Sequence, residues 1–131
     1  MTTRASGLFR ALDARDEAAL RALWSEDPQG TDEMTRGWLR GRPALEAYFA
    51  DNLPRMEEIH STIDDVAVRH WGDVEVETFV LHQHYVYDGT RYDIKAPTTM
   101  VWRREGEAWK LALVHSIPLP PASQVAPTLP P

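Results

Sequence analysis

The sequence predicts a single α+β domain in which three N-terminal helices pack against a curved antiparallel β-sheet. Hydrophobic residues recur at helical spacing in the first part of the chain and alternate after Met56. Asp88-Gly89 and Glu105-Gly106 separate long runs that are rich in β-branched and aromatic residues, and Asp-Gly is a strong hairpin signal. The chain has 131 residues, 43% of them hydrophobic, which favours one hydrophobic core. Helices followed by strands are typical of an α+β fold.

Two short helices are expected at the N-terminus. One face of the first carries Leu8, Phe9 and Leu12. In DEAALRALW, Asp16 is suited to be the N-cap of the second helix, because its carboxylate can accept hydrogen bonds from backbone N–H groups of the first turn. The packing surface continues at i, i+3, i+4 spacing with Leu20, Leu23 and Trp24.

A polar segment and a third helix follow. Residues 25–41, SEDPQGTDEMTRGWLRG, are punctuated by Gly and Pro, so we expect a loop and then a short strand at 35–39. The third helix begins within GRPALEAYFADNL, because Pro43 suits the first helical position, where an N–H has no intrahelical partner. One side of this helix is lined by Leu45, Tyr48, Phe49 and Leu53.

Four antiparallel strands are expected at 61–71, 73–87, 91–104 and 108–117. An apolar face of the third is formed by Tyr92, Ile94, Ala96, Met100 and Trp102, and one of the fourth by Trp109, Leu111, Leu113, His115 and Ile117. In the second strand we interpret Val74 and Val76 as inner positions, which also turns His82 and His84 inward. The outward set would then include Phe79, Leu81 and Tyr85 unless a β-bulge intervenes.

Composition limits the classes of function. The formal net charge is -6 and the 14 Lys and Arg residues are scattered, which argues against nucleic-acid binding. No apolar run is long enough to cross a membrane, and the N-terminus lacks the apolar core of a signal peptide, so we expect a cytoplasmic protein. The chain has no cysteine, which leaves His, Asp and Glu as candidate metal ligands.

The end of the chain is rich in proline. The segment SIPLPPASQVAPTLPP contains six of the ten prolines, which lack the N–H needed for sheet pairing. We therefore predict one domain over residues 1–118 and a Pro-rich C-terminal tail over residues 119–131.

Two sequence motifs accompany this order of elements: GRPALEAYF at the start of the third helix, and TTMVWRREGEAWKLALVHSIPLP, with its E-G-x-x-W turn, at the end of the domain. They resemble the nuclear transport factor 2 (NTF2)-like superfamily, specifically its SnoaL-like and DUF4440-like members. The resemblance covers residues 5–118 and implies a cystatin-like cone, in which a bent sheet wraps around three helices and encloses a pocket for a small hydrophobic molecule. It also implies a homodimer formed through the outer face of the sheet.

The resemblance leaves the function open between two classes. Enzymatic relatives include isomerases, polyketide cyclases and dehydratases, whereas other members are non-catalytic assembly or transport domains. This sequence departs from ketosteroid isomerase, which needs a tyrosine on the first helix and two carboxylates in the pocket; the first helix here offers Phe9. No cofactor is predicted.

Histidines are the candidate catalytic residues. If His82 and His84 point inward, they lie above a cavity that His115 also reaches from the last strand. Histidine suits general acid/base catalysis because its ordinary pKa is near neutrality. The alternatives are a three-histidine zinc site, which a single H-x-H pattern indicates only weakly, and strand histidines without chemistry. We predict no metal.

Four further residues are candidates for substrate binding. The inner stripe of the third helix carries Tyr48, whose hydroxyl could donate a hydrogen bond to a ligand. We expect Trp38 to form the floor of the cavity and Trp102 to form part of its wall. Thr99 matches a threonine of the family that the sequence resembles. The predicted function is binding of a hydrophobic carbonyl or hydroxyl compound, with isomerase, cyclase or dehydratase activity centred on histidine. The alternative is a non-catalytic ligand-binding or association module, in which arginines 36, 40 and 42 meet a small anion.

Overall fold

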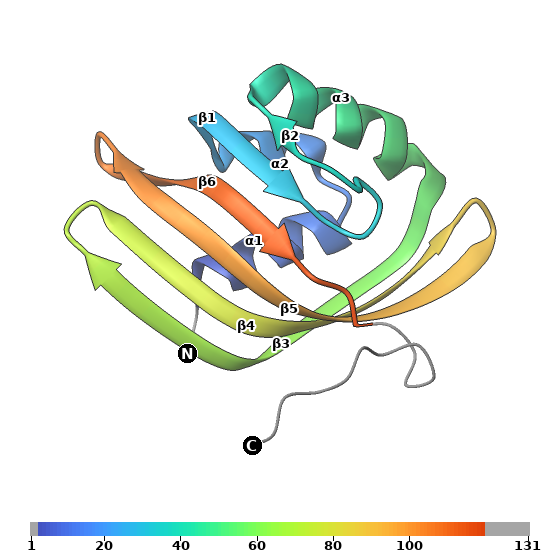
Figure 1. Ribbon diagram of the computed structural model, residues 1–131. Coiled ribbons are helices and arrows are strands. Elements are labelled where there is room, and N and C mark those ends of the chain that lie inside the picture. The colour runs from blue at the N-terminus through green and yellow to red at the C-terminus, as the bar shows by residue number, and fades with distance from the viewer. Residues whose placement is uncertain (1–2, 120–131) are drawn as a thin grey trace.

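The computed structural model describes residues 3–119, and Figure 1 shows three helices on the concave side of a curved sheet. The helices are α1 (Arg4–Asp13), α2 (Glu17–Ala22) and α3 (Arg42–Asn52), followed by a 3₁₀ turn, η1 (Leu53–Arg55). The strands are β1 (Trp24–Thr31), β2 (Leu39–Arg40), β3 (Met56–Trp71), β4 (Val74–Tyr87), β5 (Thr90–Glu105) and β6 (Ala108–Ser116). The strand order is β2-β1-β6-β5-β4-β3, and the α+β prediction is confirmed. The predicted tail lies, from residue 120 on, outside the described residues.

The second and third helices begin where the sequence predicts. The Asp16 carboxylate accepts a hydrogen bond from the Ala19 N–H at 3.0 Å, which confirms its role as the N-cap of α2. Thr3 caps α1 in the same way, through the Ser6 N–H at 3.0 Å. Pro43 lies in the first turn of α3. Between residues 3 and 119 no helix combines the length and apolarity that crossing a membrane requires.

The loop predicted to begin at residue 25 is wrong in its first part, which is strand β1. Pro28 is accommodated where the pairing of β1 with β6 shifts register, between Trp24 and Gln29. At Gly30 an added Cβ would lie 2.8 Å from Cγ1 of Val114, so glycine is what allows β1 to approach β6. β1 runs parallel to β6, and the sheet is therefore mixed rather than wholly antiparallel.

The inner face of β4 is the opposite of the predicted one. The buried residues of β4 are Glu77, Phe79, Leu81, Gln83 and Tyr85. His82 and His84 therefore lie on the outer face, together with Val74 and Val76. The prediction failed because the two valines lie near the exposed β3–β4 hairpin. Glu77, by contrast, is fully buried against the start of α1. Its carboxylate accepts a hydrogen bond from the Ala5 N–H there, at 3.1 Å.

A register shift also changes the predicted face of β6. The pairing of β5 with β6 is interrupted between Val101 and Trp102. Beyond this irregularity Val114 and Ser116 line the inside, and Leu113 and His115 alternate with them on the outside. The strict alternation expected from Trp109 to Ile117 is therefore broken.

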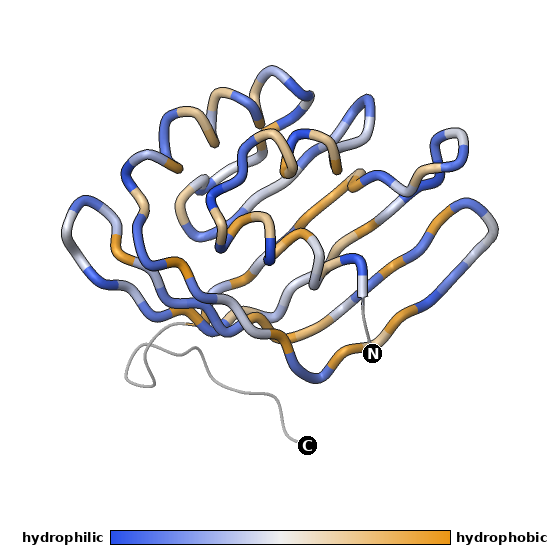
Figure 2. Tube along the Cα trace, turned by 180° about the vertical axis from the view of Figure 1, so that it is seen from behind, coloured by the Kyte–Doolittle hydropathy of each residue, from blue (hydrophilic) through white to orange (hydrophobic). Residues whose placement is uncertain are grey.

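The core fills the space between the helices and the sheet. Phe9 of α1 meets Phe79 of β4 edge to face, with ring centroids 5.9 Å apart. Other buried members of this core are Leu8, Leu20, Trp24, Leu45, Met56, Met100 and Leu111. The tips of the hairpins are mainly hydrophilic (Figure 2). The core residues that face α3 and the end of β1 leave a cavity, which is the candidate site.

Candidate functional site

A cavity of about 120 Å³ lies between α1, α3, the end of β1 and the inner face of the sheet. Most of its lining is apolar and includes Leu8, Phe9, Leu20, Trp24, Phe49, Met56, Leu81 and Met100. An engineered apolar cavity of about 150 Å³ is large enough to hold benzene. The size and lining therefore suit a compact molecule with a six-membered ring.

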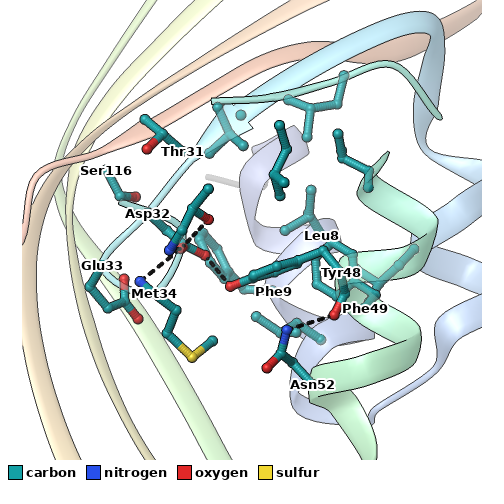
Figure 3. A pocket seen from close by; sticks show the side chains of 18 of the residues that line it. Leu8, Phe9, Thr31, Asp32, Glu33, Met34, Tyr48, Phe49, Asn52 and Ser116 are labelled. Atoms are coloured by element: carbon teal, nitrogen blue, oxygen red, sulfur yellow. Dashed lines mark hydrogen bonds between the residues drawn. The ribbon is translucent and has the colours of Figure 1, made fainter. Parts of the chain in front are cut away.

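The polar groups of the cavity come mainly from the segment that follows β1. Figure 3 shows Asp32, Glu33 and Met34 across the cavity from Tyr48 and Asn52 on α3. The segment is held in place by the Asp32 Oδ1 atom, which accepts hydrogen bonds from the N–H groups of Met34 and Thr35, both at 3.0 Å. The Thr35 hydroxyl donates to the same oxygen at 2.8 Å. This local turn directs the second carboxylate oxygen, Oδ2, toward α3.

Asp32 and Tyr48 form the shortest polar contact in the cavity. The Tyr48 hydroxyl donates to Asp32 Oδ2 at 2.6 Å. The pKa of Tyr48 is raised, mainly by burial and further by the charge of Asp32, so this phenol stays neutral. A tyrosine hydroxyl has a single proton. In this arrangement the proton is directed to Asp32, and Tyr48 can offer a ligand only an acceptor.

Glu33 is the carboxyl group whose protonation the cavity perturbs. Burial raises its pKa, and the neighbouring charge of Asp32 raises it further. The Tyr85 hydroxyl donates to Glu33 Oε1 at 3.3 Å. Burial and the charge of Glu33 in turn raise the pKa of Tyr85. Glu33 can thus hold a proton closer to neutral pH than an exposed glutamate can.

Asn52 joins α3 to the sheet at the edge of the same cavity. Its Nδ2 atom donates to the Tyr48 carbonyl oxygen at 2.8 Å, and its Oδ1 atom accepts from the Tyr87 hydroxyl at 2.7 Å. Both ends of the amide are thus engaged. Asn52 therefore positions the end of α3 against the sheet.

The predicted catalytic histidines do not reach this cavity. On the outer face, His82 Nε2 lies 3.1 Å from Asp64 Oδ2. His84 packs against His60 of β3, with ring centroids 5.2 Å apart, and His115 stacks on Trp38 at 5.7 Å. Over the described range, residues 3–119, no three His, Asp or Glu side chains are grouped as they would need to be to hold a metal ion.

The predicted binding residues are divided between the cavity and other places. Tyr48 lines the cavity, whereas the cavity lining does not include Trp38, Thr99 or Trp102. Trp38 is 44% exposed, and Trp102 is a core residue that is 1% exposed. Thr99 lies on the outer face, because its neighbours Thr98 and Met100 are buried on the inner one.

Sequence reasoning missed the carboxyl groups of the site. Asp32 and Glu33 lie in TDEMT, within the polar segment predicted to begin as a loop. Two adjacent carboxylates just before a short strand and an aromatic helix were the available signal. Without knowledge of β1, nothing in the sequence placed them against Tyr48.

The whole chain can be compared with known proteins. The family model of the SnoaL-like domain matches residues 4–120 of this chain. The chain belongs to the SnoaL-like domain family. A search of curated proteins finds no significant match.

Solved structures similar to this SnoaL-like chain share its fold. A candidate dehydratase of the NTF2-like family from Streptomyces avermitilis is 20% identical, with a TM-score of 0.79, covering 88% of this chain and 91% of that one. A candidate calcium/calmodulin-dependent protein kinase II association domain from Xanthomonas campestris is 20% identical, with a TM-score of 0.75 and coverages of 88% and 82%. A candidate aromatic ring hydroxylase from Novosphingobium aromaticivorans is 18% identical, with a TM-score of 0.77 and coverages of 88% and 83%. At these identities the likeness shows the fold alone, and the predicted NTF2-like fold is confirmed.

Proposed function

We propose that this SnoaL-like protein binds a small, uncharged, mainly apolar molecule in the cavity and that Glu33 exchanges a proton with it. The observation that carries the proposal is the Glu33 carboxyl group, which lines an apolar cavity beside a second carboxylate and has a raised pKa. Such surroundings raise the pKa of the carboxyl group, so its acid form persists to a higher pH than that of an exposed glutamate, which suits a group that takes up and returns a proton.

The charges around the cavity favour an uncharged ligand. The lining contains Asp32 and Glu33 and, among the described residues, no Lys, Arg or His. Arg42 is one of the arginines that the alternative function assigns to anion binding, but its guanidinium donates to the carbonyl oxygens of Trp24 at 2.8 Å and Ser25 at 3.1 Å. A carboxylate ligand would therefore meet two carboxyl groups and no compensating charge.

Proton transfer at this site suits elimination of water or isomerisation. Glu33 in its base form can accept a proton from a carbon next to a carbonyl group, and in its acid form it can protonate a departing hydroxyl group. Tyr85 holds one oxygen of Glu33, which leaves the other oxygen for the ligand. A dehydratase-like reaction is in keeping with the name of the similar protein from Streptomyces avermitilis.

The competing assignment places acid/base chemistry on His82, His84 or His115, as expected from the sequence. Such a reaction would have to take place on the outer face of the sheet or at its edge, because that is where these rings lie. The two assignments predict different effects of replacing Glu33 and the histidines in the same assay.

The proposal is tested with a small hydroxy ketone that fits the cavity, 3-hydroxycyclohexanone. Loss of water would give the conjugated enone, whose ultraviolet absorption reports the rate. We expect the protein to accelerate this elimination, or to accelerate exchange of the acidic ring hydrogen in D₂O. If the compound binds in the cavity and neither reaction is faster than in buffer, the catalytic part of the proposal is wrong and the non-catalytic function replaces it.

The outer face of the sheet favours a second function, association with another copy of the chain. Three neighbouring outward residues, Val76, Val101 and Leu113, form a row across β4, β5 and β6. A parallel row contains Val80 and Pro97, with Ile117 hydrogen-bonded to Pro97 at the edge. We propose that these apolar rows form a homodimer interface, as the family resemblance implies.

The homodimer is tested by the mass of the protein in solution. Val101→Glu places a charge in the middle of the apolar row, so we expect the dimer to dissociate to monomers in analytical ultracentrifugation. Thr62→Glu is the matched control, because Thr62 pairs with His82 on the polar part of the sheet and its substitution should leave the dimer intact. A wild-type monomer at micromolar concentration would contradict the proposal.

A further inference from the structure

A chain of three polar residues connects the end of α1 to the cavity. The Ser61 backbone N–H donates to Asp13 Oδ2 at 3.0 Å, and the Ser61 hydroxyl donates to Asp13 Oδ1 at 2.6 Å. Gln83 Nε2 in turn donates to Ser61 Oγ at 3.0 Å. Of these three, Gln83 lines the cavity and is 8% exposed.

The direction of these hydrogen bonds follows from chemistry. An ionised carboxylate can only accept, so the Ser61 hydroxyl must use its single proton toward Asp13. Ser61 Oγ is then left as an acceptor, and the Gln83 group that meets it must be the NH₂ end of the amide. The Oε1 atom of Gln83 therefore points away from Ser61 as a free acceptor. Within residues 3–119 this Oε1 atom has no hydrogen-bond partner, and it is not fully sealed from solvent.

The two tyrosine hydroxyls near the carboxylates also present acceptors. The Tyr48 and Tyr85 hydroxyl protons are directed to Asp32 and Glu33. Glu33 can switch from acceptor to donor by taking up a proton. A ligand that carries a hydroxyl group can satisfy both, by donating to Gln83 and accepting from Glu33, whereas a ketone has no proton to give.

We propose that Gln83 is the specificity-determining residue of the cavity, and that Asp13 and Ser61 are positioning residues that fix its amide so that it selects alcohols over ketones. This inference rests on the proposed binding function and adds the substrate class: a neutral, compact alcohol. A ketone of the same shape leaves the buried Gln83 oxygen without a donor, which makes its binding roughly 5- to 100-fold weaker.

The test compares cyclohexanol with cyclohexanone and follows the methyl signals of Met34 and Met100, which line the cavity, by NMR. We expect the wild-type protein to bind the alcohol at least about fivefold more tightly. In Asp13→Asn the new NH₂ group donates to Ser61 Oγ, the Ser61 hydroxyl turns toward Gln83, and the amide of Gln83 flips. The cavity then presents an NH₂ group, which an alcohol and a ketone can both accept, so the preference for the alcohol should be lost.

Two further variants make the result specific. Gln83→Met has a similar length and no amide, so it should also abolish the preference, and it tests the inference even if Asp13→Asn does not fold. Asp16→Asn is the matched control, because the same chemical change at the N-cap of α2 lies outside the three-residue chain and should keep the alcohol preference.

The outcomes separate this inference from the proposed function. If both compounds bind in the cavity with equal affinity, or if Gln83→Met keeps the alcohol preference, the role of Gln83 is wrong and the binding function stands. If neither compound shifts the methionine signals at millimolar concentration, the binding function itself is wrong. A parallel loss of affinity for both compounds in Asp13→Asn would show a structural role alone and would overturn the positioning role.

Discussion

Replacing Glu33 by glutamine is expected to lower the rate of water elimination from 3-hydroxycyclohexanone by about 10²- to 10⁴-fold, the usual contribution of a general acid or base. Glutamine has the shape of glutamate and can still accept the Tyr85 hydroxyl, so the cavity should keep its form. What is lost is the titratable proton. Binding of cyclohexanol should change much less than the rate, because the apolar walls are unaltered.

The pH dependence of the wild-type rate follows from the raised pKa of Glu33. The reaction starts with Glu33 in its base form, which takes the ring proton next to the carbonyl group and then gives it to the departing hydroxyl group, so the rate should rise as the pH rises through that pKa. Glu26→Gln, an exposed glutamate on β1, is the matched control and should react like wild type. If Glu33→Gln reacts normally while glutamine at His82, His84 or His115 removes activity, the chemistry belongs to histidine.

Replacing Glu77 by alanine is expected to destabilise the fold by about 1–3 kcal/mol, before any cost of the cavity that the substitution leaves. Glu77 is fully buried, and its Oε1 atom accepts the Ala5 N–H, an otherwise unpaired donor in the first turn of α1. Alanine leaves that N–H without a partner. Glu77→Gln keeps an acceptor there and should retain the helix start. Urea unfolding measures both variants.

The same glutamate should make stability depend on pH. Burial raises the pKa of Glu77 in the folded protein, so the folded state keeps a proton that the unfolded chain has released. Its contribution to the free energy of unfolding is therefore full below the ordinary glutamate pKa, about 4.3, and declines as the pH rises through the folded-state value. The gain of Glu77→Gln over wild type should grow with pH. Glu57→Gln, on the exposed surface, should show no such trend, and a constant difference for Glu77→Gln would contradict the account.

Patterns that depend on neighbouring residues made most of the fold predictable. Asp16 and Pro43 identified helix starts because capping and the missing proline N–H act within one turn. Asp88-Gly89 identified a hairpin for the same reason, since both residues adopt positive φ, 49° and 83°. β1 was missed because Pro28 and Gly30 are loop residues by composition and become strand residues only against β6.

The site was less predictable because its geometry depends on contacts between distant segments. Asp32 and Tyr48 are 16 residues apart and are brought together by the turn after β1. Ser61 meets Asp13 across 48 residues. The inner face of β4 was misassigned because Glu77 is buried for a tertiary reason, the start of α1, and not because of the alternation in its own strand. Because side chains alternate along a strand, placing Glu77 outside also placed His82 and His84 on the wrong face.

The central claim is that Glu33, inside the cavity, is the titrating group that meets the ligand. The direct measurement is an NMR titration of the ¹³C-labelled Glu33 carboxyl group and the histidine rings, with and without cyclohexanol. The account predicts that Glu33 titrates above the ordinary glutamate value and that its signal moves when the alcohol is added, while the signals of His82, His84 and His115 stay in place. An ordinary titration of Glu33, together with histidine signals that respond to the ligand, would contradict it.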